Sequence, residues 1–228
     1  MTISISDLRF SWPGDAHPTL SVPTFKIESG ERVLLRGPSG CGKSTLLAAL
    51  AGVIDVPPQT VSVAGIDVGT LPQGKRDAFR VDHIGLIFQV FNLIPWLSVR
   101  DNVTLPCTFS TRRRGRVSGS AASEAEALLS SLGLSKHIAS PASSLSHGQQ
   151  QRVAAARALI GSPELILADE PTSALDPEAK EQFMALLTQE ATRTGAALLM
   201  VSHDPGLGSH FDRVVDMRDI NSPEDVTC

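Results

Sequence analysis

The chain has 228 residues, of which 42% are hydrophobic and 19% are charged, and its formal net charge is −4. This length is enough for one sizeable core or two small lobes, and the composition is typical of a globular protein. The mild negative charge argues against nucleic-acid binding, which requires a basic surface. The longest apolar run, Leu46–Ile54, is far shorter than the roughly 20 residues that cross a bilayer, and the N-terminal sequence MTISISDLRF lacks the pattern of a signal peptide. We therefore expect a cytoplasmic chain.

The first third of the chain combines short apolar runs with loops. Residues 2–10 predict a strand, because apolar and polar residues alternate there except near Asp7. The segment Ser11–Pro23 is rich in Pro and Gly and is expected to be a loop. The later elements expected in this part are a helix from Lys43 to about Val53 and strands at Glu31–Arg36, Val61–Val63 and Ile84–Phe88.

The middle of the chain has a different character, because prolines and polar residues interrupt it. Residues Arg112–Ser120 are expected to form a solvated loop, with a membrane-surface role as the less favoured alternative. Ser123 and Glu126 resemble a capping box that opens a helix ending at Leu132. A second helix is expected over His147–Ile160.

Strand patterns return in the last third of the chain. Short continuous apolar runs there are typical of strands that are buried on both faces. The expected elements are strands at Leu165–Ala168, Ala196–Ser202 and Val214–Met217, a helix at Pro177–Arg193 and a short helix at Asp204–His210. Because strands and helices alternate at both ends of the chain, we predict an α/β core that a helical insertion interrupts at about residues 90–160.

A glycine-rich segment lies between a predicted strand and a predicted helix. Its sequence, GPSGCGKST, matches the P-loop pattern G-x-x-x-x-G-K-[ST]. The glycines allow backbone N–H groups to turn onto phosphate oxygens at a helix N-terminus. Lys43 is expected to reach the β- and γ-phosphates, and the Ser44 hydroxyl to ligate Mg²⁺. The predicted nucleotide-binding residues are Gly37, Pro38, Ser39, Gly40, Cys41, Gly42, Lys43, Ser44 and Thr45.

Two carboxylates follow the predicted strand Leu165–Ala168. Ligands bind at the carboxyl ends of strands in open α/β sheets, so Asp169 and Glu170 are expected to face the bound nucleotide. Mg²⁺ prefers carboxylate and phosphate oxygens, which suits Asp169. Glu170 is then placed to orient or deprotonate an attacking water. An acidic pair after a strand is by itself a weak indication of a catalytic site, and a solvated acidic loop is the alternative. The P-loop upstream favours the catalytic role.

Further motifs make the chain resemble the ABC ATPase family over nearly its whole length. The sequence LSHGQ at residues 145–149 resembles the family signature LSGGQ, and Ser173–Asp176 resembles the D-loop. Gln89 and His203 hold the positions of the Q-loop glutamine and the switch histidine. The resemblance implies a P-loop NTPase (RecA-like) core with an antiparallel N-terminal β subdomain. It further implies one domain over residues 1–228, with a RecA-like lobe at 1–89 and 161–228 and a helical subdomain at about 90–160.

The resemblance also implies a mechanism that needs two cassettes. They form a head-to-tail dimer around two ATP molecules, so that Ser146, Gly148 and Gln149 of one subunit complete the ATP site of the other. Asp176 would communicate between the subunits. ATP would close the dimer and hydrolysis would open it.

Within each site the family assigns catalytic roles to three residues. Glu170 would activate water, His203 would hold the γ-phosphate, and Gln89 would sense the metal and the attacking water. The expected cofactors are ATP and Mg²⁺, with metal contacts from Ser44, Gln89 and Asp169.

Three positions depart from the usual family pattern. The family stacks adenine on an aromatic residue, usually Tyr; this chain has no Tyr, and Trp12 holds that place. Adenine stacking is the favoured role for Trp12, and a packed loop residue is the alternative. His147 replaces the first Gly of the signature, so we expect hydrolysis with an altered rate or pH dependence. Cys41 is either a reactive thiol or a small filler. With Cys107 and Cys228 it forms neither metal-ligand spacing nor an obvious disulfide framework.

The chain looks most like the ATPases of lipoprotein release and macrolide export, which work with FtsX-like permeases and sometimes act as mechanical transducers. We therefore expect an ATPase subunit on the inner face of the cell membrane, with segment Phe88–Pro106 receiving the permease. A homodimer is expected. The alternatives are a non-transport ABC ATPase in a soluble complex and a small-molecule kinase.

Overall fold

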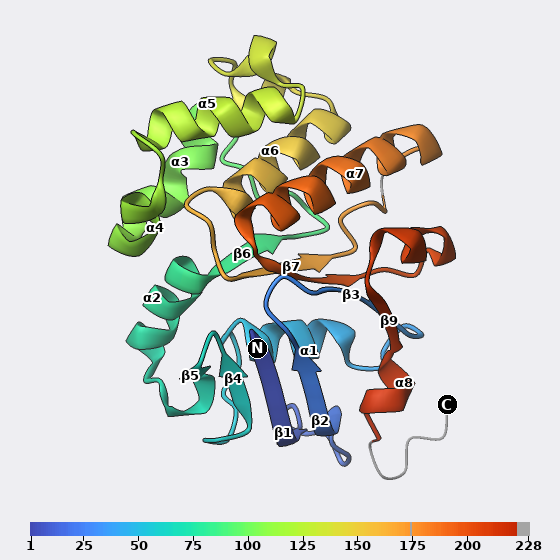
Figure 1. The fold of residues 1–228 in the computed structure, drawn as a ribbon. Helices are drawn as coiled ribbons and strands as arrows, with labels where there is room; N and C mark the ends of the chain where they lie inside the picture. The colour runs from blue at the N-terminus through green and yellow to red at the C-terminus, as the bar shows by residue number, and fades with distance from the viewer. Residues whose placement is uncertain (174, 223–228) are drawn as a thin grey trace.

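The computed structural model describes residues 1–173 and 175–222, so Cys228 lies outside the described residues. Its two β-sheets confirm the predicted α/β class (Figure 1). The smaller sheet is antiparallel, with strand order β2-β1-β4-β5, and consists of Ile3–Phe10 (β1), Leu20–Ile27 (β2), Val61–Val63 (β4) and Ile66–Asp67 (β5). It is the antiparallel N-terminal sheet that the family resemblance implies.

The strand pair β1–β2 contains a matched irregularity. The alternation of buried residues in β1 is offset by one position between Ile5 and Leu8, which belong to the same core, and Asp7 between them has a positive φ of 49°. Pro23 lies opposite on β2, at the edge of the sheet, where a missing N–H breaks no ladder. The prediction of a loop through residue 23 was therefore wrong at its end, because β2 already begins at Leu20.

The larger sheet is parallel, with strand order β6-β7-β8-β3-β9. Successive residues of its central strands point to opposite sides, as the two-residue period of a strand requires. In β3, for example, Val33 and Leu35 enter one apolar core and Leu34 enters the other. The strands are Arg32–Arg36 (β3), Ile84–Ile87 (β6), Leu165–Asp169 (β7), Ala197–Val201 (β8) and Arg213–Asp216 (β9).

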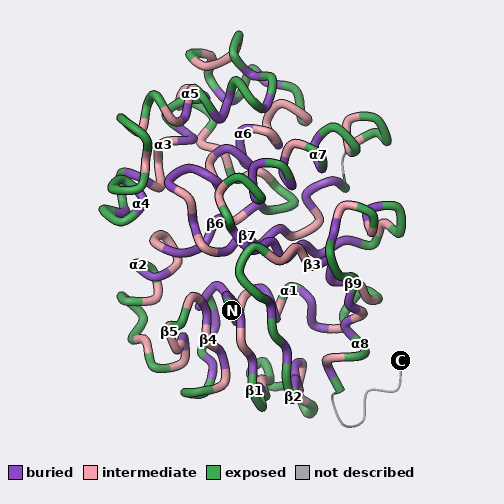
Figure 2. Tube along the Cα trace, in the orientation of Figure 1, coloured by how far each residue is buried: buried purple, intermediate pink, exposed green. Residues whose placement is uncertain are grey.

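Helices cover both faces of the parallel sheet (Figure 1). The helix Lys43–Leu50 (α1) packs between the two sheets, and the helices Val99–Phe109 (α3), Ala121–Ser131 (α5), His147–Leu159 (α6) and Pro177–Thr194 (α7) pack on the other face. Figure 2 shows burial concentrated on the central strands and the helix faces that touch them. The remaining α-helices are Gln73–His83 (α2), Thr111–Arg116 (α4) and Met217–Ile220 (α8), and short 3-10 helices lie at Val68–Thr70, Ser135–His137, Ala142–Ser144 and Pro205–His210.

The structure corrects three further local predictions. The second capping residue of α5 is Ser123, and Ser120 is the N-cap, so the capping box begins three residues earlier than predicted. The last predicted strand ends at Asp216, because Met217 begins α8. Helix α3 continues through Pro106 although prolines were expected to interrupt this region.

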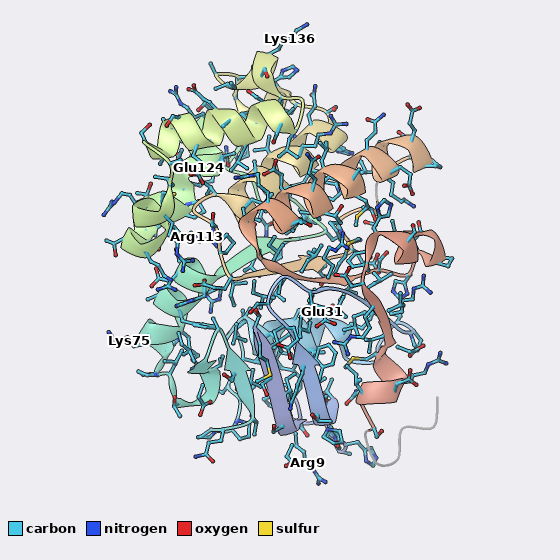
Figure 3. All side chains as sticks on the ribbon, in the orientation of Figure 1. Arg9, Glu31, Lys75, Arg113, Glu124 and Lys136 are labelled. Carbon is cyan, nitrogen blue, oxygen red and sulfur yellow. The ribbon has the colours of Figure 1, made fainter. Side chains whose placement is uncertain are left out.

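The predicted solvated loop at Arg112–Ser120 is the largest error. Residues 111–116 form helix α4, and Arg113 is only 1% exposed. Its guanidinium donates to the carbonyl oxygens of Ala158 (3.1 Å) and Ile160 (3.0 Å) at the end of α6 and of Ile84 (2.6 Å) at the start of β6. Carbonyls at a helix C-terminus lack internal partners and attract a cation, so Arg113 joins α4 to α6 and β6 (Figure 3).

Candidate functional site

The loop between β3 and α1 is shaped by its glycines. Gly40 and Gly42 have positive φ angles of 82° and 96°, in the region that favours glycine. A Cβ at Gly42 would lie 3.0 Å from the carbonyl oxygen of Thr19. Glycine at these positions therefore allows the loop to turn tightly and to pack against Thr19 before α1 begins at Lys43.

Lys43 is the charged group at the centre of this loop. Only 7% of the residue is exposed, and its Nζ donates to the carbonyl oxygens of Gly37 (2.8 Å) and Pro38 (2.7 Å). The Cys41 Sγ lies 3.8 Å from the same Nζ. An ammonium group held at the N-terminus of a helix provides fixed positive charge for an anion.

Ser44 and Asp169 come from different halves of the chain and meet beside the loop. The Ser44 hydroxyl, on the first turn of α1, donates to Asp169 Oδ2 at the end of β7 over 3.1 Å. A hydroxyl and a carboxylate in contact are suitable oxygen ligands for a hard cation such as Mg²⁺. The residues predicted to contact the metal from these two elements are thus adjacent.

Glu170 has an unusual backbone conformation and a carboxylate oxygen that accepts no hydrogen bond. Its φ is 46°, and its N–H donates to the Val201 carbonyl at the end of β8 over 3.0 Å. This anchor turns the chain immediately after Asp169. Oε1 of Glu170 is buried without a hydrogen bond, and His203 Nε2 is 3.4 Å away. A buried acceptor without a partner is rare in proteins and available to a ligand.

These groups line one cavity of about 330 Å³ at the carboxyl end of the parallel sheet. It brings together residues from both ends of the chain, as the sequence predicted. Thr19 and Val201 also line it and were not predicted, because neither carries a motif. The predicted residues in the lining are Ser39, Gly40, Gly42, Lys43, Ser44, Thr45, Gln89, Asp169, Glu170 and His203.

The signature residues do not line this cavity. Ser146 caps α6: its hydroxyl accepts from the Gln149 N–H (3.4 Å), and the Gln149 side chain accepts from the Ser146 N–H (2.9 Å). His147 is exposed, with its ring 6.2 Å from that of Phe91. Asp176 similarly caps α7 by accepting from the Ala179 N–H (2.9 Å). The signature therefore lies on an exposed helix start, apart from the loop of its own chain.

A neighbouring cavity of about 640 Å³ extends from the loop toward α8 and includes Cys41, His17 and Asn221 in its lining. Asn221 ties this region together, because its amide donates to the carbonyls of Thr19 and Cys41, each over 3.1 Å. Trp12 is 44% exposed and packs edge-on against Phe10, with ring centroids 5.1 Å apart. Its indole does not line either cavity.

Comparison with known proteins agrees with this geometry. The family model described as "ABC transporter" matches residues 20–173. The chain belongs to the ABC transporter family. Over 210 residues it is 42% identical to the macrolide export ATP-binding/permease protein MacB of Rhodopirellula baltica, covering 92% of this chain but 30% of that protein. It is 41% identical to the lipoprotein-releasing system ATP-binding protein LolD of Anaeromyxobacter dehalogenans, covering 96% of this chain and 91% of that protein.

Solved structures of the family share the fold. The dimeric ATP-binding cassette MJ0796, in a post-hydrolysis state with ADP and Pi, aligns with a TM-score of 0.83 and 32% identity over 99% of each chain. The chain spans about a third of the length of MacB-type relatives and nearly all of LolD. Within residues 1–173 and 175–222, no helix combines the length and the apolar character needed to cross a membrane.

Proposed function

We propose that this chain is the ATP-binding and ATP-hydrolysing subunit of an ABC transporter, acting as a dimer that drives a membrane permease. The observation that carries the proposal is the single cavity shared by the Lys43 loop, Ser44, Asp169, Glu170 and His203. Two short segments far apart in sequence supply phosphate-binding, metal-binding and base functions at one place. The MJ0796 structure with ADP and Pi supports hydrolysis at this kind of site.

The loop holds the triphosphate and the metal. Lys43 and the N–H groups of the loop bind phosphate oxygens, which replace the Gly37 and Pro38 carbonyls as partners of the ammonium. Ser44 and Asp169, whose side chains are in contact, would hold Mg²⁺. Among the described residues no cluster of three His, Cys, Asp or Glu side chains could hold a metal, which fits a cation that takes its other ligands from phosphate and water. When bound, Mg²⁺ neutralises charge that develops on the phosphates.

Glu170 and His203 act on the attacking water and the γ-phosphate. Glu170 Oε1, which accepts no hydrogen bond within the chain, is placed to accept a proton or hydrogen bond from water. His203 Nε2, 3.4 Å from that oxygen, is placed to donate to the γ-phosphate once ATP enters. Gln89 lines the same cavity, where it would contact the attacking water and the metal. We infer that adenine stacks on Trp12, whose ring is accessible at 44% exposure.

A second cassette completes each site. The reciprocal hydrogen bonds between Ser146 and Gln149 hold both side chains at the start of α6. N–H groups at the start of a helix can bind anions. In our proposal these groups and Gly148 meet the γ-phosphate of the partner's ATP. The dimeric form of MJ0796 supports this arrangement. The RecA-like lobe (1–89 and 161–228) and the helical lobe (about 90–160) would move relative to each other as the dimer closes.

We infer that the partner in the membrane is an FtsX-like permease, which is the class that the sequence resemblance implies; relatives named for macrolide export and lipoprotein release support a role beside a permease. It docks on the segment Phe88–Pro106, where Val90 and Trp96 are 73% and 80% exposed. The chain therefore works at the inner face of the cell membrane without entering it.

Glu170→Gln tests the catalytic assignment. It should lower phosphate release by about 10² to 10⁴-fold, leave ATP binding intact and stabilise an ATP-bound dimer in size-exclusion chromatography with light scattering. Glu178→Gln, the same change at an exposed site on α7, is the matched control. Near-normal hydrolysis by Glu170→Gln would contradict the site. Phosphate transfer to a small acceptor would indicate a kinase, and the absence of stimulation by permease-containing membranes would indicate a soluble complex.

A further inference from the structure

The signature at the start of α6 depends on a side chain of its own, that of Gln149. The two halves of the capping box are unequal: the Ser146 hydroxyl accepts from the Gln149 N–H over 3.4 Å, whereas Gln149 Oε1 accepts from the Ser146 N–H over 2.9 Å. Hydrogen bonds of this kind are normally about 2.7–3.2 Å long, so the firmer half is the one that the Gln149 side chain supplies. Any group that fixes this side chain therefore also fixes the start of α6.

His137 fixes the other side of the Gln149 amide. Gln149 Nε2 and His137 Nε2 are 3.1 Å apart, and both residues are half-buried. Because Gln149 Oε1 faces the Ser146 N–H, the amide presents its NH₂ group to His137. The hydrogen bond then requires that His137 Nε2 accept and that the ring carry its proton on Nδ1. The amide of Gln149 thus connects the imidazole of His137 to the N–H of Ser146.

The backbone that carries His137 is itself anchored. His137 ends the 3-10 helix Ser135–His137, and its carbonyl oxygen accepts from the Ser140 N–H over 2.9 Å. The carbonyl of Ser140 in turn accepts from the Val99 N–H at the start of α3, also over 2.9 Å. The imidazole is therefore held from a second helix of the helical lobe, and it can keep the Gln149 side chain in one conformation.

The contact between His137 and Gln149 is separate from the nucleotide cavity of the same chain, because neither residue lines that cavity. Its loss would leave the P-loop, Asp169 and Glu170 in place. The start of α6 is exposed at Ser146, and the N–H groups of a first helical turn lack intrahelical partners and can bind phosphate oxygens. An effect of His137 on catalysis must therefore arise where this helix start meets a second molecule.

We propose that His137 is a positioning residue for ATP hydrolysis, which orients Gln149 so that the first turn of α6 and the Ser146 hydroxyl face the γ-phosphate of the partner's ATP. This role rests on the proposed function, in which the signature completes the site of a second cassette. Donors bind a developing charge best when they are ordered beforehand. His137 touches neither nucleotide nor water. It acts through Gln149, and it acts on the ATP site of the second cassette.

The test measures ATP-dependent dimerisation of the full chain by light scattering, with Glu170→Gln as the parent so that ATP is retained. Adding His137→Phe removes the acceptor and keeps a ring. One lost hydrogen bond changes an equilibrium by up to about tenfold, and a dimer contains two signatures, so dimerisation should weaken about 10- to 100-fold. Binding of a fluorescent ATP analogue to the single chain should stay the same.

Two further variants separate positioning from general damage to the helical lobe. His137→Gln places an amide oxygen where Nε2 accepts and should restore dimerisation to the level of the parent. Lys136→Phe introduces the same ring at the exposed neighbouring position of the 3-10 helix, which projects from the molecule in Figure 3, and should leave dimerisation unchanged. Equal dimerisation of the His137→Phe protein and its parent would overturn the inference.

The ring of His137 tests the hydrogen bond without any change to the signature. Nitrogen NMR shifts distinguish an imidazole nitrogen that carries a proton from one that does not, and the His137 signals are those missing from the His137→Gln protein. In mildly alkaline buffer we expect Nε2 to be the nitrogen without a proton. The opposite tautomer would overturn the inference, and this measurement decides the question if His137→Phe fails to fold. A parent that forms no dimer with ATP would instead refute the proposed function, and this inference with it.

Discussion

Replacing Arg113 by Met should destabilise the protein strongly, although the residue is part of a run of arginines. Arg113 donates to three buried carbonyl oxygens, at 3.1, 3.0 and 2.6 Å. Met fills much of the volume but leaves those oxygens without a donor, and each unsatisfied group costs about 1–3 kcal/mol. The substitution also removes the cost of burying the Arg113 charge, which offsets part of this loss of stability. We expect a net loss of about 3 kcal/mol, a large share of the roughly 5–15 kcal/mol that stabilises a typical domain.

Urea unfolding followed by circular dichroism measures the effect as a change in the free energy of unfolding. The matched control is Arg114→Met on the same helix, because Arg114 is exposed and surface changes usually stay within about 0.5 kcal/mol. Equal stabilities of the Arg113 and Arg114 variants would refute the reasoning. Such a result would mean that α4 does not hold the end of α6 in solution.

Three further predictions concern single side chains. Burial alone would raise the pKa of Glu164, but hydrogen bonds from His83, Arg116 and Arg112 lower it well below the ordinary 4.5. The unfolded chain therefore binds more protons than the folded chain in acid, so the free energy of unfolding falls as the pH drops below about 4.5. Glu164→Gln should flatten that part of a curve of stability against pH. His147→Gly should retain hydrolysis but change its rate, because this side chain stands at the exposed start of α6, next to Ser146 and Gly148 of the signature; equal rates of phosphate release by the two proteins would count against a role for this side chain. Cys41 is half-buried in the nucleotide-binding loop, and we expect it to be alkylated at neutral pH and protected by ATP. Cys107 should not react, because burial raises the pKa of its thiol. Peptide mapping by mass spectrometry measures both, and an unlabelled Cys41 would exclude a reactive thiol.

Much of the core could be predicted from local patterns. The strands β3, β6, β7 and β8 are short continuous apolar runs with few alternative structures. The elements that were missed depend on distant partners. Strand β2 contains Pro23, and only its pairing with β1 makes it a strand. Helix α2 consists mostly of polar residues, so its sequence does not indicate that Phe79 and His83 are buried. Helix α4 contains four arginines, and only the carbonyls at the end of α6 and the start of β6 explain why one of them is buried.

The sequence by itself determined the chemistry of the nucleotide site. GPSGCGKST and Asp169–Glu170 are local motifs, because a phosphate-binding loop and a strand end each need particular residues at fixed spacing. What only the tertiary structure decided is which residues share a space. Parallel strands from both ends of the chain place Ser44 3.1 Å from Asp169 and His203 3.4 Å from Glu170. Buried Arg113 belongs to the same category, since its carbonyl partners lie at the end of α6 and the start of β6 and no motif connects them with α4. Sheet and helix packing alone brings them together.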